Sequence, residues 1–180
     1  LTFSRSTTVL EFLKEAAKFR KFEVIIAESA PTFEGQQMAV DLGKEGIDST
    51  VITDSAIFAL MSRVNKVIIG THSVFASGGI LAQSGTFGLA AAAKHHAVPV
   101  VVLSALYKLS PRFVSDPKTM NEHKSPAAIL EYGNEIISRA SVENPSFDYV
   151  PAEFITLFIT NLGGYSPSYI YRLLTELYHP

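Results

Sequence analysis

Two carboxylates follow apolar stretches of the chain and are the first candidates for chemistry. Glu28 comes directly after Val24–Ala27, and Asp54 comes directly after Thr50–Thr53. A positioned carboxylate can act as a general acid or base in catalysis. Each also has a structural alternative. Asp54 can cap a following helix, the role we favour for it, and Glu28 can accept hydrogen bonds from loop amides.

A long loop rich in small residues, Gly70–Thr86, is the next candidate. Gly85 and Thr86 stand where a helix is expected to begin, and backbone N–H groups at a helix start can hold an anion. Such a site is weak without a nearby cation, and Arg5 is the closest candidate to supply one. The segment therefore predicts a weak anion site.

The sequence contains few residues or motifs that could bind a metal ion or a cofactor. The chain has no cysteine, so thiol nucleophiles and thiolate metal ligands are excluded. His95 and His96 are adjacent, and neighbouring helical residues point about 100° apart, which hinders binding of one ion. A helix C-terminus that favours imidazole is the simpler interpretation. The common nucleotide and hydrolase motifs are missing, namely G-x-G-x-x-G, G-x-x-x-x-G-K-[ST], G-x-S-x-G and H-E-x-x-H. We therefore predict no metal and no cofactor.

Aromatic residues concentrate near the C-terminus, where Tyr165, Tyr169 and Tyr171 are candidates for an interface. Core packing is the ordinary fate of aromatic side chains. Tyr169 and Tyr171 must nevertheless point in different directions on a helix, so we expect some of these tyrosines at the surface. Surface tyrosines are enriched at protein interfaces.

The elements that must position these residues alternate between strand and helix patterns over the first hundred residues. Apolar residues at helical spacing predict helices, the first capped at Ser6, Thr7 or Thr8 and the second stopping at Gly46. Continuous apolar runs predict five strands, at Leu1–Phe3, Phe22–Ala27, Thr50–Thr53, Lys66–Gly70 and Val98–Leu103. This pattern is typical of an α/β, doubly wound, Rossmann-like fold with a mainly parallel sheet and helices on both faces. Ligands in such folds lie outside the carboxyl ends of the strands.

The second half of the chain is less regular. Prolines punctuate the segment Ala105–Val150, which predicts a long connection that is functional or ordered by a partner. A short strand or helix is possible at Ile129–Leu130. Two C-terminal helices are predicted, one starting at Pro151 and the other at Pro167. We expect residues 1–180 to form a single domain.

Composition narrows the classes of function. Lys and Arg number 15 against 17 Asp and Glu, a net charge of −2, which argues against direct nucleic-acid binding through a broad basic surface. No apolar run approaches the ~20 residues that a membrane span needs. Because the sequence begins at Leu1 rather than Met and is apolar at once, we expect it to be part of a longer protein.

The sequence as a whole resembles the regulatory subunits of eukaryotic translation initiation factor 2B. The stretches that carry the resemblance include LTFSRSTTVLEFLKEAAK, FEVIIAESAPTFEGQQMA, VITDSAIFALMSRVNKVIIGTHSVFASGGI, SGTFGLAAAAKHHAVPVVVL and FDYVPAEFITLFITNLGG. The last stretch, PSYIYRLLTELYHP, is similar to the end of the beta subunits. Family members also carry an N-terminal helical domain, which this fragment lacks.

The same superfamily includes sugar-phosphate isomerases that act on methylthioribose 1-phosphate and ribose 1,5-bisphosphate. Their catalytic cysteine falls near Ser4, and His72 stands where the motif G-[AC]-D-R places the catalytic aspartate. Ala30 replaces the phosphate-binding arginine of E-[TS]-R-P, while Ala82 and Gln83 replace the Asn and Lys of A-N-K-I-G-T. The residues that still match the isomerases are scaffold residues, namely Glu28, Pro31, Gly35, Asp54, Gly70, Gly85 and Thr86. The resemblance thus implies a vestigial pocket without catalytic residues.

By this resemblance the chain is expected to be a non-catalytic regulatory domain of the guanine nucleotide exchange factor for initiation factor 2. It would act in the cytoplasm, assemble with alpha and delta regulatory subunits, join the catalytic gamma and epsilon subunits, and help to sense the phosphorylated alpha subunit of initiation factor 2. The isolated domain could also self-associate. The alternatives are a sugar-phosphate isomerase, or a sensor that binds a sugar phosphate or nucleotide in the old pocket.

Overall fold

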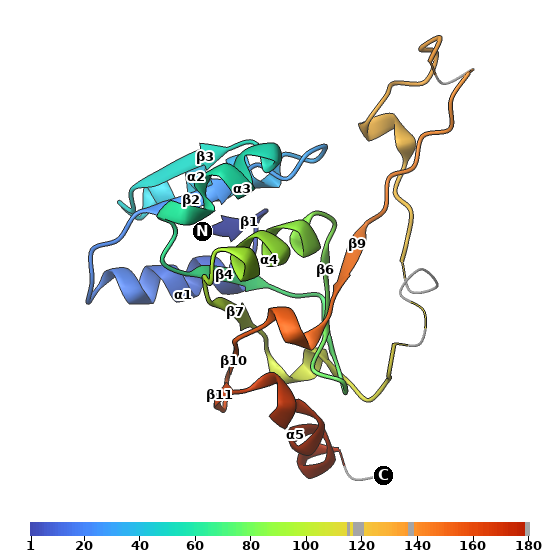
Figure 1. The fold of residues 1–180 in the computed structure, drawn as a ribbon. Coiled ribbons are helices and arrows are strands. Elements are labelled where there is room, and N and C mark those ends of the chain that lie inside the picture. Colours follow the sequence, from blue (N-terminus) through green and yellow to red (C-terminus); the bar gives the residue numbers. More distant parts are fainter. Residues whose placement is uncertain (115, 117–120, 137–138, 179–180) are drawn as a thin grey trace.

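The central feature of the structure, a computed structural model, is a twisted sheet between two layers of helices (Figure 1). The structure describes residues 1–114, 116, 121–136 and 139–178. The strands of this sheet are β1 (Thr2–Phe3), β2 (Val24–Ala27), β3 (Ser49–Ile52), β4 (Val67–Gly70), β7 (Val100–Leu103), β10 (Leu157–Thr160) and β11 (Gly163–Tyr165). The five strands predicted in the first hundred residues are thus confirmed; β3 begins and ends one residue earlier than expected, and the other four begin one or two residues later.

The strand order identifies the topology. The strands pair in two groups, β1-β2-β3 and β11-β10-β7-β4. A backbone hydrogen bond of 2.9 Å from Ile68 N to Leu1 O joins the groups beside β1 and β4. The order is therefore β3-β2-β1-β4-β7-β10-β11, and every ladder in the two groups is parallel except that of β10 with β11. The chain reverses direction across the sheet at β1 and β4, and this switch point is where doubly wound folds bind ligands.

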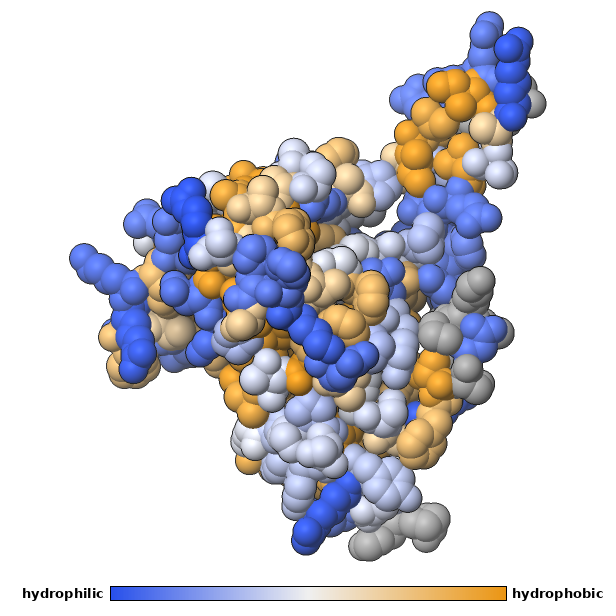
Figure 2. Space-filling model, viewed as in Figure 1, coloured by the Kyte–Doolittle hydropathy of each residue, from blue (hydrophilic) through white to orange (hydrophobic). Residues whose placement is uncertain are grey.

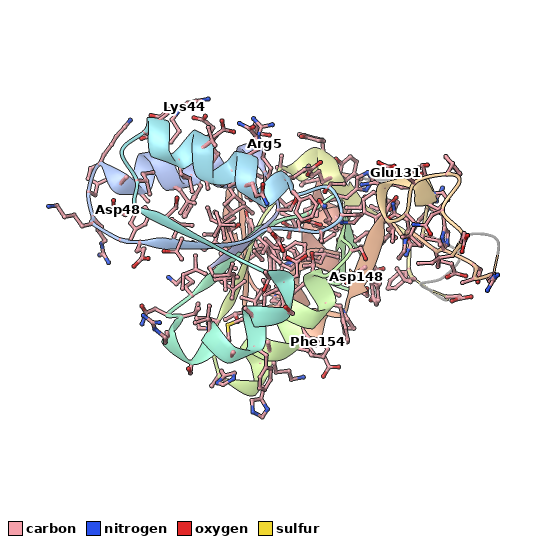
Figure 3. All side chains as sticks on the ribbon, turned by 90° about the horizontal axis from the view of Figure 1, so that it is seen from above. Arg5, Lys44, Asp48, Glu131, Asp148 and Phe154 are labelled. Carbon is pink, nitrogen blue, oxygen red and sulfur yellow. The ribbon has the colours of Figure 1, made fainter. Side chains whose placement is uncertain are left out.

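Helices cover both faces of the sheet because alternate residues of its strands face opposite ways. Val101 and Leu103 of β7 pack in one apolar cluster with α1 (Thr7–Ala17) and α2 (Glu34–Lys44). Val100 and Val102 pack in the other cluster with α3 (Ile57–Leu60) and α4 (Thr86–His95). Figure 3, the view from above, shows α1 and α2 on one side of the strands and α3 and α4 on the other. The predicted fold class is confirmed.

The small-residue segment predicted as a loop, Gly70–Thr86, is instead a hairpin of β5 (Ser73–Phe75) and β6 (Ile80–Gln83). Its apolar residues Val74, Phe75 and Ile80 are buried, so they define strands despite the surrounding glycines and serines. The two strands extend into a second sheet with β8 (Leu109–Ser110) and β9 (Phe147–Val150) in the order β8-β5-β6-β9. The segment therefore contributes two strands to a second sheet beside the switch point, rather than a loop.

The first predicted C-terminal helix is wrong. After Pro151 the chain makes one 3-10 turn, Ala152–Phe154, and then forms strand β10 parallel to β7. The β-branched residues Ile159 and Thr160 of this strand favour extended structure, and the apolar spacing alone did not reveal it. The second predicted helix is confirmed, since a 3-10 turn at Pro167–Tyr169 leads into α5 (Ile170–Leu177).

The described residues between Pro111 and Ser146 leave the main body as an arm that β9 brings back (Figure 1). Near Ile129, where a short element was considered, the arm contains a 3-10 turn at Pro126–Ala128. Ile129, Tyr132 and Ile136 are exposed on the arm, and Figure 2 shows hydrophobic residues gathered there. Among the described residues, no helix combines the length and the hydropathy that a membrane crossing requires.

Candidate functional site

A cavity of about 290 Å³ opens at the switch point, at the carboxyl ends of β1 and β4. Of the residues predicted for the site, the cavity brings five together, namely Ser4, Gly70, His72, Gln83 and Thr86. Glu28, Asp54 and Gly85 lie outside its lining. The loop between β1 and α1 and the residues after β4 form most of the wall, as the doubly wound topology requires.

Ser4 is held in a strained conformation at the start of the cavity. Its φ is 59°, in the left-handed region that serine rarely adopts, and its side chain is buried. Ser4 Oγ lies 3.0 Å from Glu34 Oε2 and 2.9 Å from Gln83 Oε1. Gln83 Nε2 donates in turn to Ser29 Oγ at 2.8 Å. Polar side chains from four segments, namely the β1–α1 loop, the β2–α2 loop, α2 and β6, therefore bond to one another across this edge of the sheet.

Asp54 does not cap the helix that follows it. The residue before it, Thr53, is the N-cap of the 3-10 turn Asp54–Ala56 and makes no side-chain capping bond. The Asp54 carboxylate instead accepts hydrogen bonds from the amides of Ser29 and Ala30 at 2.8 and 2.7 Å. It has the loop-binding role that was considered for Glu28, because Ile52 of β3 pairs with Ala27 at the end of β2 and brings the two loops together.

The predicted anion site at Gly85 and Thr86 is already occupied by the protein. Asp148 of β9 accepts hydrogen bonds through Oδ2 from the amides of Gly85, at 2.8 Å, and Phe87, at 3.0 Å. The Thr86 hydroxyl donates a hydrogen bond to the carbonyl oxygen of Gln83 at 2.6 Å. A carboxylate on the free amides of a helix start is the same contact that a bound phosphate would make. Figure 3 shows Asp148 next to α4.

Two cations lie along the cavity, and each is engaged. Arg5 Nε pairs with Asp41 Oδ2 of α2 at 2.8 Å, and the hydrogen bond from Arg5 holds the pKa of the Asp41 carboxyl below its usual value. Lys108 Nζ donates to the carbonyl of Thr71 at 2.7 Å, and partial burial lowers the pKa of its ammonium. Arg5 thus points to α2 rather than to the start of α4. Lys108 was not predicted, since it lies in an irregular segment.

The remaining candidates are found in ordinary surroundings. His72 Nδ1 lies 3.0 Å from Ser73 Oγ, and its ring packs 4.7 Å from that of Phe147. His95 ends α4 and His96 is its C-cap, the position the sequence suggested. In the described part of the chain, no three His, Asp or Glu side chains form a group that could hold a metal ion.

The three candidate interface tyrosines lie at the C-terminal end of the structure. Tyr165 and Tyr169 stack with their ring centroids 5.5 Å apart, and Arg172 lies over Tyr169. Tyr171 is 56% exposed, and its ring is tilted against that of Phe113, at 6.1 Å between centroids. Tyr169 is half-buried and Tyr171 is exposed, so the two side chains point in different directions as expected.

Several groups around the cavity that could bind a phosphate are already bonded within the protein. Two sets of backbone amides that could bind phosphate hold the carboxylates of Asp54 and Asp148. The hydroxyl of Ser4, a weak nucleophile without a strong base, faces only a carboxylate and an amide oxygen. Glu34, Asp148 and Lys108 were missed because each comes from a segment without a motif and meets the site through tertiary folding.

Residues 1–167 match the sequence pattern of the initiation factor 2 subunit family. The chain belongs to this family. Over 179 residues it is 55% identical to the translation initiation factor eIF2B subunit beta of Dictyostelium discoideum, covering 99% of this chain and 46% of that protein. The chain thus spans about half the length of this relative.

The family also contains enzymes. Ribose 1,5-bisphosphate isomerase of Archaeoglobus fulgidus is 31% identical over 182 residues, covering 98% of this chain and 56% of the isomerase. Among solved structures, the translation initiation factor eIF-2B subunit delta of A. fulgidus superposes with a TM-score of 0.85 at 26% identity, covering 98% of this chain and 55% of that one. The fold is therefore shared by initiation factor subunits and an isomerase.

Proposed function

We propose that this chain is the regulatory domain of a beta subunit of the exchange factor for initiation factor 2, and that it works by assembly rather than by catalysis. The observation that carries the proposal is the 55% identity to an eIF2B beta subunit across 99% of the chain. The partners it implies are the related alpha and delta regulatory subunits, the gamma and epsilon subunits, and initiation factor 2 with its phosphorylated alpha subunit. The compartment it implies is the cytoplasm.

The geometry of the cavity supports a non-catalytic role. Isomerisation of a sugar phosphate needs a positioned acid and base, together with cationic or amide contacts to phosphate. Here Asp148 and Asp54 occupy amides that could bind phosphate, and Arg5 is paired with Asp41. We propose that Ser4, Glu28, Asp54, Gly70, His72, Gln83, Gly85 and Thr86 are what remains of an ancestral pocket.

The candidate assembly surface is the one around Tyr165, Tyr169 and Tyr171. Tyr171 is the most exposed of the three, and Tyr169 is stacked against Tyr165, which limits the side-chain entropy lost on binding. The antiparallel edge strand β11 carries Tyr165 and lies at the end of the sheet. Aromatic side chains beside an open strand edge suit association with a related subunit.

Co-expression with a delta regulatory subunit tests the assembly proposal. We expect the two chains to co-elute in size-exclusion chromatography as one complex whose mass exceeds that of either chain alone. Separate elution of two folded chains would contradict the proposal. A complex that contains only copies of this chain would instead indicate self-association through the same surface.

An isomerase is the alternative, favoured by the 31% identity to ribose 1,5-bisphosphate isomerase. Incubation of the purified chain with ribose 1,5-bisphosphate or methylthioribose 1-phosphate distinguishes the two functions. We expect no isomerised product above a protein-free control. Product formation that Ser4→Ala abolishes would establish catalysis at this cavity and overturn the non-catalytic proposal.

A further inference from the structure

A second, larger cavity of about 660 Å³ lies at the opposite edge of the sheet, where the strands begin. The end of α1, the loop into β2 and the segment before β4 form its walls. We call it the basal groove. Its floor is apolar and includes Leu1, Phe12, Leu13, Phe22, Val24, Val64 and Ile68. Phe12, Phe22 and Ile68 are only half-buried, so apolar surface remains in contact with solvent.

The rim of the basal groove is basic. Arg20, Lys21, Arg63 and Lys66 line it and are all exposed. Among the described residues, none of these four cations takes part in an ion pair. The one carboxylate of the lining, Glu23, accepts a hydrogen bond from Thr50 at 2.7 Å. Four unpaired cations in one place stand out on a chain whose net charge is −2.

The floor also contains an unused hydrogen-bonding group. Thr2 lines the groove and is 1% exposed, and its Oγ1 has no hydrogen-bond partner in the described part of the chain. Buried hydroxyls are normally paired, because leaving one unpaired lowers stability. Because this oxygen is itself out of contact with solvent, the features of the groove that can meet a partner are its apolar floor and its basic rim.

We propose that the basal groove binds an acidic amphipathic segment of a partner protein. An apolar floor fits the apolar face of such a segment, and the basic rim pairs with carboxylates on its flanks. The phosphate backbone of a nucleic acid would pair with the cations but would leave the half-buried aromatic and aliphatic side chains of the floor uncovered. This binding surface is separate from the C-terminal tyrosines and from the cavity at the switch point.

Fluorescence anisotropy tests the proposal with two labelled peptides that share leucines on one helical face. One carries glutamates on the opposite face and the other carries lysines. The glutamate peptide should bind the chain and the lysine peptide should not, and added salt should weaken the binding. Arg63→Glu with Lys66→Glu should weaken it about tenfold, the effect of two exposed ion pairs.

A matched control is the double variant Lys124→Glu with Arg139→Glu, which makes the same change in net charge on the distant arm. It should bind the glutamate peptide like wild type. Equal effects of the two double variants, or binding of both peptides alike, would overturn the proposal. So would competition by poly(U) at equal affinity, which would indicate a nucleic acid.

Two further outcomes concern other occupants of the groove. If sedimentation shows that the wild-type chain is a dimer and that Arg63→Glu with Lys66→Glu makes it a monomer, the groove binds a second copy of this chain. If the polypeptide extends before Leu1 and that extension fills the groove, the longer form will not bind the peptide, and the assignment to a separate partner is then wrong. The groove variant should still co-elute with a delta subunit, so this test is independent of the assembly proposal.

Discussion

At the scale of single residues, the most informative position is Asp148. Its carboxylate bonds to the amides of Gly85 and Phe87 and so fills a helix start that could otherwise bind an anion. A strand residue more than sixty positions away in sequence thus occupies the amides that the local sequence suggested could bind an anion. The side chain both stabilises α4 and blocks one route to phosphate binding.

Replacing Asp148 tests this role. Asp148→Ala leaves two amides unpaired and should lower the free energy of unfolding by about 1–3 kcal/mol, measured by urea denaturation. Sulfate should then bind the vacated amides, so it should raise the melting temperature of the variant more than that of wild type. Glu153→Ala, which removes only the exposed pair with Lys94, is the control and should change both quantities little. An equal response of variant and wild type to sulfate would contradict the account.

Arg5 and Asp41 provide a prediction on pH. The pKa of the Asp41 carboxyl is lowered below 3.8, chiefly by the hydrogen bond from Arg5. A carboxyl whose folded pKa is depressed stabilises the fold above its unfolded pKa, and that stability is lost as the pH falls through the folded pKa. Asp41→Asn should therefore be less stable than wild type near neutral pH, and the gap in the free energy of unfolding should narrow as the pH falls below about 5.

The comparison requires urea denaturation of both proteins across that range. Arg5→Ala removes the other partner of the ion pair. Its difference from wild type in the free energy of unfolding should narrow over the same pH range. A gap between wild type and Asp41→Asn that stays constant with pH would mean that the pair does not act through the charge of Asp41.

At the scale of elements, the packing of α2 against the end of β2 depends on a glycine. A Cβ added at Gly35 would overlap the carbonyl oxygen of Ala27 and lie 2.8 Å from the Cα of Glu28. Both are backbone atoms that cannot move aside. The helix therefore approaches the strand as closely as it does only because residue 35 has no side chain.

Two alanine substitutions in the same helix should act in opposite directions. Gly35→Ala should destabilise the fold by about 1–3 kcal/mol through this overlap. Gly43→Ala, with no atom within 4 Å of the added Cβ, should stabilise it by about 0.5–1 kcal/mol because alanine favours the helix. Thermal unfolding of both variants measures the difference. Destabilisation of equal size at both positions would show that the close contact is not the cause.

The elements also show how far the sequence predicts this fold. Strands β2, β4 and β7 were predictable because each is a short continuous apolar run between helical patterns. The hairpin β5–β6 was hidden because glycines and serines surround its few apolar residues. β10 was taken for a helix, since the apolar residues after Pro151 fit a helical spacing as well as a strand.

The site was predictable only in outline. The switch point followed from the topology, so Ser4, Gly70 and His72 were placed correctly at the edge of the cavity. The contacts around the cavity could not be predicted. Asp148 and Glu34 come from elements whose neighbours in the folded protein are not revealed by any local sequence pattern. The helix-capping role expected of Asp54 failed for the same reason, as a loop beside β2 binds its carboxylate instead.

At the scale of the whole molecule, binding features lie on different sides of one sheet. The switch-point cavity lies at the carboxyl ends of the strands, the basal groove lies at their amino ends, and the candidate assembly tyrosines lie on and after the edge strand β11. Such a distribution suits a domain that joins several proteins.

The dissociation constant of this chain for a delta regulatory subunit, measured by analytical ultracentrifugation, tests the central claim most directly. We predict stable association that Tyr171→Ala weakens about tenfold or more, as expected for an aromatic residue within an interface. Tyr132→Ala, which removes a tyrosine that is 71% exposed on the arm, should leave the constant unchanged. Absence of association between two folded chains, at concentrations well above those in cells, would contradict the claim that this domain functions by assembly.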